Sequence, residues 1–357
     1  MSENGRFVID ALVFPGHSRR RSHPIKARPH RAICSGMVKC DLFLMQDIPH
    51  PRYIEMAQLA EAAGCENVWV IDGQDVFPDP WATAALLAVN TGRVRIGPGV
   101  TNPVTRHPRV TAGAMLTIHE LSGGRGILGL GAGDNAVRTL GRQPARIAEV
   151  REAVDICRAR FRERKADIPI YVAANGPRLA AYACEAADGI IVPCIGTPQD
   201  LRRTLDRVEV AGRESGRSLR DLPVLIYVGF AVSHDRGEAL DDARGGVARR
   251  LLNFVYYPEH FPPELEHLRP DVDALARGYD YTQHLKSHVA HSALVSDALM
   301  EVAGIAGTPA EVLARFRALA RETAGLNATF FLRPDGQGKQ RSFELFVREV
   351  WPALRES

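Results

Sequence analysis

The sequence of 357 residues predicts a (β/α)8 barrel with an insertion after the seventh strand. Three observations predict this fold. From Met37 onward, short apolar runs alternate with amphipathic stretches. No hairpin signal joins consecutive strands, so the strands are expected to be parallel, with helical crossovers between them. Eight such units fill about the length of a closed barrel, which favours it over an open sheet.

Each expected strand is a short apolar run that ends in small or polar residues. The strands are expected at residues 38–45, 67–71, 94–101, 126–130, 168–173, 189–192, 224–232 and 328–332.

The expected helices begin at capping residues or prolines and carry one apolar face. Asp79 and Pro80 suit a helix start, Pro108 suits a first helical position, and Thr308 with Glu311 forms a capping box. The helices are expected at residues 52–63, 79–90, 108–121, 145–163, 177–187, 197–212, 308–324 and 342–354.

Residues 231–307 form the predicted insertion, which contains an aromatic and proline-rich stretch at 254–263. An insertion after a barrel strand lies on the catalytic face, so this one is expected to wall the substrate pocket. The aromatic residues could equally form a small satellite core.

The first 36 residues differ from the rest, since they hold seven Lys or Arg against Glu3 and Asp10 and lack periodicity. We interpret them as a disordered basic extension, with an over-long start as the favoured explanation and a nucleic-acid arm as the alternative. A net charge of +3 is too small to indicate nucleic-acid binding by the whole chain. No apolar run reaches the length of a membrane span. Six cysteines without a CxxC pattern indicate reduced thiols and a cytoplasmic protein.

Two small-residue turns at neighbouring strand ends predict a phosphate site. Asn175-Gly176-Pro177 and Ile195-Gly196-Thr197 each open a helix, and backbone amides at a helix start attract anions. Either turn alone could be a simple helix cap.

Asp72 and Asp134 follow two other strands, at the expected mouth of the barrel. A pocket carboxylate can orient a ring amide, or transfer a proton if burial raises its pKa. A solvated carboxylate at a helix start is the alternative. The third strand passes through Gly97-Pro98-Gly99, and such a strand end lets a flat group approach the backbone closely.

Several stretches resemble the bacterial-luciferase-like flavin oxidoreductases, in particular the branch that uses the deazaflavin coenzyme F420 and includes methylenetetrahydromethanopterin reductase. The similar stretches are VWVIDG, GPGVTNPVTRHP, LSGGRGILGLGAGD, PIYVAANGP, AADGIIVP and IAGTPAEV.

The resemblance implies hydride transfer between F420 and a small organic substrate with a C=N, C=C, C=O or alcohol group, in an enzyme that is often a homodimer. It also implies a cis peptide at Gly99–Val100 that backs the coenzyme ring. Asp72 and Asp134 are the implied catalytic residues. The implied coenzyme contacts are Asp72, Gly99, Val100, Thr101, Asn102, Asp134, Ala174, Asn175, Gly176, Pro177, Ile195, Gly196 and Thr197.

One position departs from the family pattern. Several F420 enzymes carry His after the acid that matches Asp72, whereas this chain has Gly73. Asp134 or a residue of the insertion would then have to supply the proton. An FMN-dependent two-component monooxygenase and a non-catalytic flavin-binding relative are the alternatives.

His284, His288 and His291 would share one face of a helix at this spacing. Three such histidines can bind Zn²⁺, but no carboxylate accompanies them, so we expect no metal. They would line the substrate pocket or face solvent.

Overall fold

The structure is a computed structural model, and it describes residues 38–73, 76–214, 216–284, 286 and 288–356. The predictions for residues 1–36 lie outside this part of the chain.

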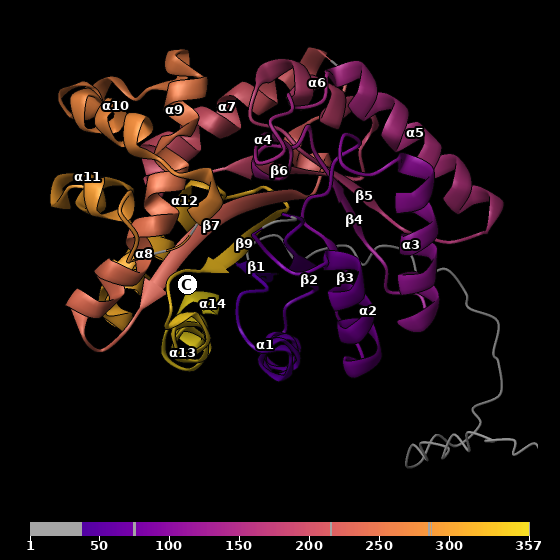
Figure 1. The fold of residues 1–357 in the computed structure, drawn as a ribbon, viewed down its shortest axis with the longest axis horizontal. Coiled ribbons are helices and arrows are strands. Elements are labelled where there is room, and N and C mark those ends of the chain that lie inside the picture. The colour runs from indigo at the N-terminus through magenta and orange to yellow at the C-terminus, as the bar shows by residue number, and fades with distance from the viewer. Residues whose placement is uncertain (1–37, 74–75, 215, 285, 287, 357) are drawn as a thin grey trace, which may run out of the picture. The chain divides into compact units, whose positions relative to one another are not determined.

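The described strands form one parallel barrel, as predicted (Figure 1). Their order is β3-β2-β1-β9-β7-β6-β5-β4, and bridges from Ile96 to Gly126 and from Thr101 to Leu130 close the ring between β3 and β4. The strands are β1 (Lys39–Leu44), β2 (Asn67–Val70), β3 (Arg95–Pro98), β4 (Leu128–Leu130), β5 (Ile170–Ala173), β6 (Gly189–Pro193), β7 (Val224–Val232), β8 (Ala306–Gly307) and β9 (Ala328–Pro334). The short β8 pairs with the end of β7 and was not predicted.

Helices surround the barrel, and most begin where the capping residues predicted. The Asp79 carboxylate accepts hydrogen bonds from the first amides of α2, and Thr308 and Glu311 form the capping box of α12. The helices are α1 (His50–Ala63), α2 (Pro80–Asn90), α3 (Pro108–Leu121), α4 (Asn135–Arg138), α5 (Ile147–Glu163), α6 (Pro177–Ala186), α7 (Pro198–Glu214), α8 (Arg236–Leu251), α9 (Asn253–Tyr256), α10 (Arg269–Gly278), α11 (Asp297–Ala303), α12 (Pro309–Glu322), α13 (Lys339–Leu345) and α14 (Trp351–Arg355).

The closing helix differs from the single helix expected at 342–354. It begins earlier, at Lys339, and a π-helical turn at Phe346–Val350 separates α13 from α14. Pro352 has no amide hydrogen for the regular bond to the carbonyl four residues earlier, which is the physical reason for the irregular turn.

The insertion builds its own small core beside β7, and Figure 1 shows α9, α10 and α11 grouped there with α8. Phe254 and Phe261 pack in this core, with ring centroids 5.2 Å apart. Tyr256 and Tyr257 instead line the cavity at the barrel mouth. Phe254 and Phe261 thus form the small satellite core. The role of the insertion in walling a substrate pocket stays a prediction, and the place of Tyr256 and Tyr257 at the cavity agrees with it.

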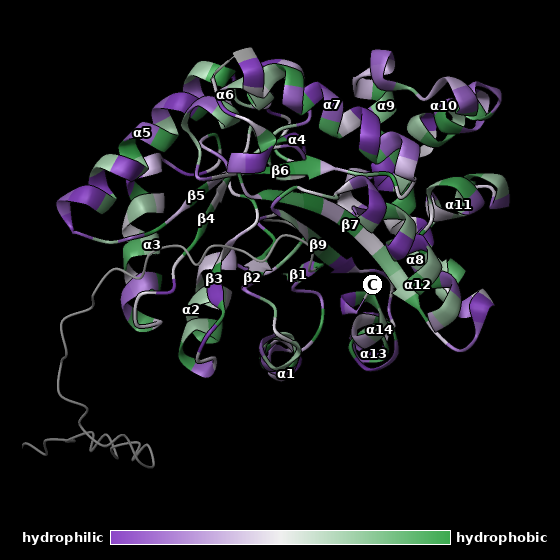
Figure 2. Cartoon of the chain, turned by 180° about the vertical axis from the view of Figure 1, so that it is seen from behind, coloured by the Kyte–Doolittle hydropathy of each residue, from purple (hydrophilic) through white to green (hydrophobic). Residues whose placement is uncertain are grey.

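Apolar side chains fill the space between the strands and the outer helices, and a second apolar layer fills the barrel interior. In Figure 2 the helices alternate between hydrophobic and hydrophilic residues along their length. The interior layer is aromatic near the mouth. Phe43 and Trp69 each meet Phe331 edge to face, with ring centroids 5.0 and 5.6 Å apart. This layer supports the end of β3 and the Gly99–Val100 backbone that follows it, which we call the shelf.

Gly97 is fixed by the close approach of β3 and β4. An added Cβ would lie 1.6 Å from the carbonyl oxygen of Ile127, which is backbone and has little freedom to move. We expect Gly97→Ala to destabilise the fold by at least about 3 kcal/mol, as urea unfolding would measure. Gly113→Ala is the matched control, because Gly113 lies on the exposed side of α3 with no heavy atom within 4 Å of an added Cβ. It should gain about 0.5–1 kcal/mol, and an equal loss in both variants would contradict the explanation.

Asp41 is fully buried inside the barrel and accepts hydrogen bonds from the Asn67 amide, the Asn67 side chain and the Trp69 indole. Burial raises the pKa of Asp41 to about 7, although these hydrogen bonds lower it. The folded state then binds this proton more tightly than the unfolded state does. Stability from Asp41 is complete below about pH 4 and is lost as the pH rises to about 7, by up to about 4 kcal/mol.

We therefore expect the urea midpoint to fall between about pH 4 and pH 7, and Asp41→Asn to flatten that slope. Asp155→Asn, which changes an exposed acid of α5, should leave the slope unchanged. A slope of the same size in Asp41→Asn would contradict this assignment.

Candidate functional site

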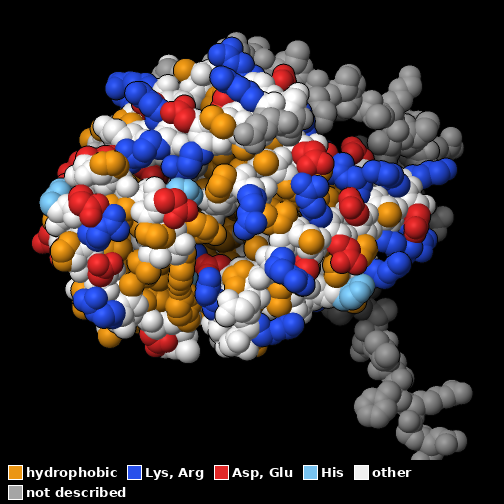
Figure 3. All heavy atoms as spheres, turned by 90° about the horizontal axis from the view of Figure 1, so that it is seen from above, with side chains coloured by type: hydrophobic (Ala, Val, Ile, Leu, Met, Phe, Trp, Pro, Cys, Tyr) orange, Lys and Arg blue, Asp and Glu red, His pale blue; other side chains and the backbone are white. Residues whose placement is uncertain are grey.

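A cavity of about 630 Å³ opens at the carboxyl ends of the strands, a volume typical of small-molecule sites. Figure 3 shows a hollow with hydrophobic side chains around it and Lys or Arg side chains beside it. Eight of the predicted site residues line the cavity: Asp72, Gly99, Val100, Asn102, Asp134, Asn175, Gly176 and Pro177.

The shelf after β3 has the predicted backbone. The Gly99–Val100 peptide is cis, and both residues line the cavity. The reason for glycine differs from the one expected, however. An added Cβ at Gly99 would lie 2.9 Å from both Phe331 and Trp69, so packing below the shelf excludes a side chain there.

The two residues after the shelf hold its shape. Thr101 is fully buried, and its hydroxyl donates to Oδ2 of Asp72 at 2.6 Å. The Asn102 side-chain oxygen accepts hydrogen bonds from the amides of Val104 and Thr105, so it fixes the turn that follows. Thr101 therefore acts through Asp72, and Asn102 presents its buried side chain at the cavity wall.

The first predicted anion turn is open to the cavity. Gly176 precedes α6 in an extended conformation, and no side chain caps the helix. Pro177 has no amide hydrogen, so the amides of Arg178 and Leu179 are the first that the helix offers, and both residues line the cavity. Ala174 lies behind this turn, buried, and its amide donates to the Ile191 carbonyl.

The second turn is closed by its own hydrogen bonds. The Ile195 amide donates to Asp200, the Gly196 amide donates to Cys194 Sγ, and the Thr197 hydroxyl caps the Asp200 amide. Ile195 borders a separate recess of about 30 Å³. This arrangement fits the simple helix cap better than a second anion turn. The coenzyme contacts expected at Gly196 and Thr197 stay a prediction.

The two predicted catalytic carboxylates have opposite electrostatic surroundings. Burial raises the pKa of Asp72, against the hydrogen bond from Thr101, which lowers it. For Asp134, burial also raises the pKa, but Arg249 and Arg138 more than offset this effect and hold it below its ordinary value. Asp134 pairs with Arg138 through Oδ1, at 2.7 Å, and with Arg249 through Oδ2. It is thus a fixed anion, whereas Asp72 can hold a proton.

His284 enters the site from the insertion and is buried at the cavity wall. Its Nδ1 lies 3.1 Å from the Tyr279 hydroxyl. Burial and the nearby Arg249 hold its pKa well below the ordinary value, so the imidazole is neutral. The described residues of this segment do not form the expected helix: a 3₁₀ turn covers Tyr281–Gln283, and His288 has a positive φ of 60°.

Sequence reasoning missed three arginines at or near the cavity: Arg249 and Arg250 line it, and Arg333 is buried against Tyr227, which also lines it. Arg249 and Arg250 come from the end of α8, and Arg333 comes from the end of β9. Arg333 donates from Nε and Nη2 to the two oxygens of Asp335, at 2.6 and 3.0 Å, and also to the Tyr227 hydroxyl. The run Arg333-Pro334-Asp335 at the last strand end was the available signal.

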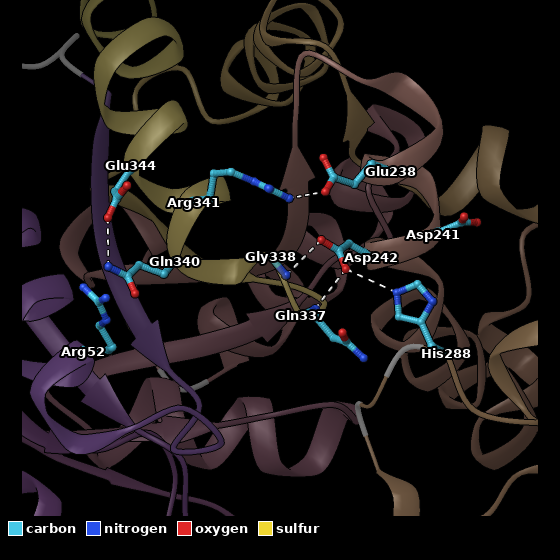
Figure 4. A pocket seen from close by; sticks show the side chains of 10 residues that line it. All are labelled: Arg52, Glu238, Asp241, Asp242, His288, Gln337, Gly338, Gln340, Arg341 and Glu344. Carbon is cyan, nitrogen blue, oxygen red and sulfur yellow. Dashed lines mark hydrogen bonds and ion pairs between the residues drawn. The ribbon is translucent and has the colours of Figure 1, made fainter.

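A second cavity of about 820 Å³ lies between α1, α8 and α13 and is lined almost wholly by polar side chains. Figure 4 shows that these side chains largely pair with one another. Asp242 accepts from the amides of Gln337 and Gly338 and lies 3.5 Å from His288, and Arg341 pairs with Glu238. It offers no apolar shelf for a ring.

Among the described residues, no group of three or more His, Cys, Asp or Glu could hold a metal ion. Within the same ranges, no helix is both long and apolar enough to cross a membrane. Five cysteines are free and buried in the same ranges, which agrees with the expected reduced thiols: Cys40, Cys65, Cys157, Cys184 and Cys194.

Comparisons with known proteins agree with the fold. A family model described as luciferase-like monooxygenase matches residues 41–327. The chain is 29% identical over 344 residues to 5,10-methylenetetrahydromethanopterin reductase of Archaeoglobus fulgidus, covering 88% of this chain and 99% of that one. It is 28% identical to F420-dependent glucose-6-phosphate dehydrogenase of Amycolatopsis mediterranei, with 85% and 93% covered. The coenzyme F420-dependent tetrahydromethanopterin reductase structure of Methanopyrus kandleri matches with a TM-score of 0.72 and 25% identity, with 89% and 100% covered.

Proposed function

The chain belongs to the luciferase-like monooxygenase family, and from this premise we propose that it is an oxidoreductase that moves a hydride between coenzyme F420 and a small organic substrate. The relatives named above are F420-dependent enzymes or methylenetetrahydromethanopterin reductases. The match to each covers nearly its whole length. One observation in this chain carries the proposal: a bare backbone shelf and an uncapped helix start open into the same cavity.

The residues present fit this coenzyme. A planar ring can lie on the Gly99–Val100 backbone, with apolar contacts from Phe43 and Ile71 at the same wall. The amides at the start of α6 and the Arg178 side chain suit the phosphate at the other end. Sequence analysis placed the phosphate at two turns, and the structure supports the Asn175–Pro177 turn.

When bound, the coenzyme supplies the hydride chemistry. The chain's own residues orient the reactants and exclude water. Asp72 can hold a proton on Oδ1 while Oδ2 accepts the Thr101 hydrogen bond. We assign Asp72 as the acid that replaces the missing histidine at Gly73. His284, which comes from the insertion, keeps a neutral imidazole at the cavity wall.

The test is a titration of the purified protein with F420 and with FMN, followed by absorbance and by calorimetry. We expect F420 to bind at least about tenfold more tightly than FMN, an energy difference of about 1.4 kcal/mol. Reduced F420 should then be oxidised by a panel of imines, enones and ketones without oxygen. Tighter FMN binding with oxygen-dependent turnover would contradict the proposal in favour of the monooxygenase alternative. Binding without turnover of any substrate would favour the non-catalytic alternative.

A further inference from the structure

Arg250 is a buried cation whose hydrogen-bonding groups are largely unused. Its side chain lines the cavity at the barrel mouth, and the residue is 3% exposed. Nη2 donates to the Ala303 carbonyl at 3.3 Å. Among the described residues, nothing accepts a hydrogen bond from its Nε or Nη1. Leaving the donors of a buried charged group unsatisfied is costly, so the position calls for an acceptor.

The neighbouring carboxylates already serve other guanidinium groups. Both oxygens of Asp335 accept from Arg333, and the closest approach of Asp335 to Arg250 is 3.7 Å, from Oδ2 to Nη1. Asp134 is divided between Arg138 and Arg249. Four guanidinium groups, three of which line the cavity, therefore share two carboxylates.

The other acids of the cavity do not correct this imbalance. Asp72 lies at the shelf with a raised pKa, and the Glu259 side chain is 64% exposed near His260. Arg178 adds a further cation at the α6 start. The cavity thus carries an excess of positive charge, and its most buried part is the guanidinium of Arg250.

Space for this guanidinium is built into β7. An added Cβ at Gly229 would lie 2.1 Å from Nη1 of Arg250 and 2.4 Å from Nη2 of Arg333. Gly246 on α8 leaves similar room for Arg333 and Asp335. Gly229 therefore makes room for Arg250 at the cavity wall, and Gly246 makes room for the Arg333–Asp335 pair beside it.

We propose that Arg250 anchors a carboxylate of the substrate, so that the enzyme acts on small carbonyl, imine or enone compounds that carry a carboxylate group. This inference rests on the proposed function. An oxyanion could also come from the coenzyme. The substrate is the better source, because Arg250 and Ala303 belong to the insertion, whereas the coenzyme phosphate has its own site at α6.

The first test compares each acid with its methyl ester on the wild-type protein loaded with F420. 4-Oxopentanoate, crotonate and benzoate serve as probes, and calorimetry measures their dissociation constants. At least one acid should bind tenfold or more tightly than its ester. Equal affinities within all three pairs overturn the proposal. The same comparison without F420 tests carboxylate binding by Arg250 separately. If the coenzyme fails to bind, only the proposed function is contradicted.

The second test uses Arg250→Met, with Arg244→Met as the matched control. Arg244 lies on the same helix but pairs with Asp241 and Asp297, away from the cavity. Arg250→Met should lose the preference for the acid, keep its affinity for F420, and unfold at the same or a higher temperature. Arg244→Met should keep the preference for the acid.

If Arg250→Met instead weakens F420 binding tenfold and keeps the acid preference, the anion belongs to the coenzyme and the proposal is wrong. If Arg250→Met does not fold, Arg250→Lys replaces it. This variant keeps the charge and should retain part of the preference for the acid. If the wild type shows the preference and Arg250→Lys loses it completely, a role based on charge is overturned.

Discussion

Asp72→Asn is expected to lower the rate of substrate reduction by about 100-fold or more, with little change in the affinity for F420. Asn keeps the size of the side chain and can still accept the Thr101 hydrogen bond, but it carries no acidic proton. Burial favours the protonated carboxyl at Asp72, which is the form that a proton donor needs. Stopped-flow measurement of F420 oxidation in one turnover would give the rate.

The pH dependence has a definite sign. Because the pKa of Asp72 is raised, the protonated form extends to higher pH than in a free carboxyl, and reduction of the substrate should slow as the pH rises through that pKa. This decrease is the high-pH limb of the pH–rate profile, and Asp72→Asn should remove it.

Asp134→Asn is the comparison. It removes the partner of Arg249 and Arg138 but leaves Asp72 intact, so the high-pH limb should persist. A limb that disappears in Asp134→Asn and persists in Asp72→Asn would reverse the assignment of the two acids.

Most of the barrel could be predicted because its signals are local. A cap such as Asp79 satisfies amides two and three residues away, and the run 224–232 is apolar along its whole length. The strand β8 has two residues and pairs through Ala306 and Gly307, too few for a hydropathy pattern. The closing helix contains a π-helical turn just before Pro352, whereas the hydropathy pattern predicts one continuous helix there.

The shelf was predicted for a reason that is only partly right. Glycine was expected at residues 97 and 99 because a flat ligand approaches there. In the structure, the Ile127 carbonyl leaves no room for a side chain at Gly97, and Trp69 and Phe331 leave none at Gly99. Those contacts join residues far apart in the chain, so no single segment contains them. The open cavity above Gly99 and Val100 follows from this packing.

The roles of the polar residues could not be separated without coordinates. Asp72 and Asp134 looked alike in the sequence, each following a strand. Arg249 lies 115 residues from Asp134 and decides that this carboxylate stays ionised. His284 and Arg250 lie in the insertion, whose path no periodicity predicts. Their position at the cavity wall depends on how α8 packs against β7.

The second large effect is expected at the start of α6. Gly176→Asp should weaken F420 binding by at least about tenfold, because a carboxylate at this position occupies the amides of Arg178 and Leu179 and repels the phosphate. Gly176 has an extended backbone, with φ −118°, and the nearest atom to an added Cβ is Tyr257 Cε1 at 3.6 Å. A side chain therefore fits without strain. The helix itself should gain a few tenths of a kcal/mol from the new cap.

Gly176→Asn separates the two causes, because asparagine caps the same amides without a charge. If the phosphate needs those amides, Gly176→Asn should weaken binding as well, and the further loss in Gly176→Asp measures the repulsion. The extra loss should shrink as salt is raised from about 0.05 to 0.5 M, since screening weakens charge repulsion near the surface. Unchanged F420 affinity in both variants would place the phosphate elsewhere and remove the main support for this orientation of the coenzyme.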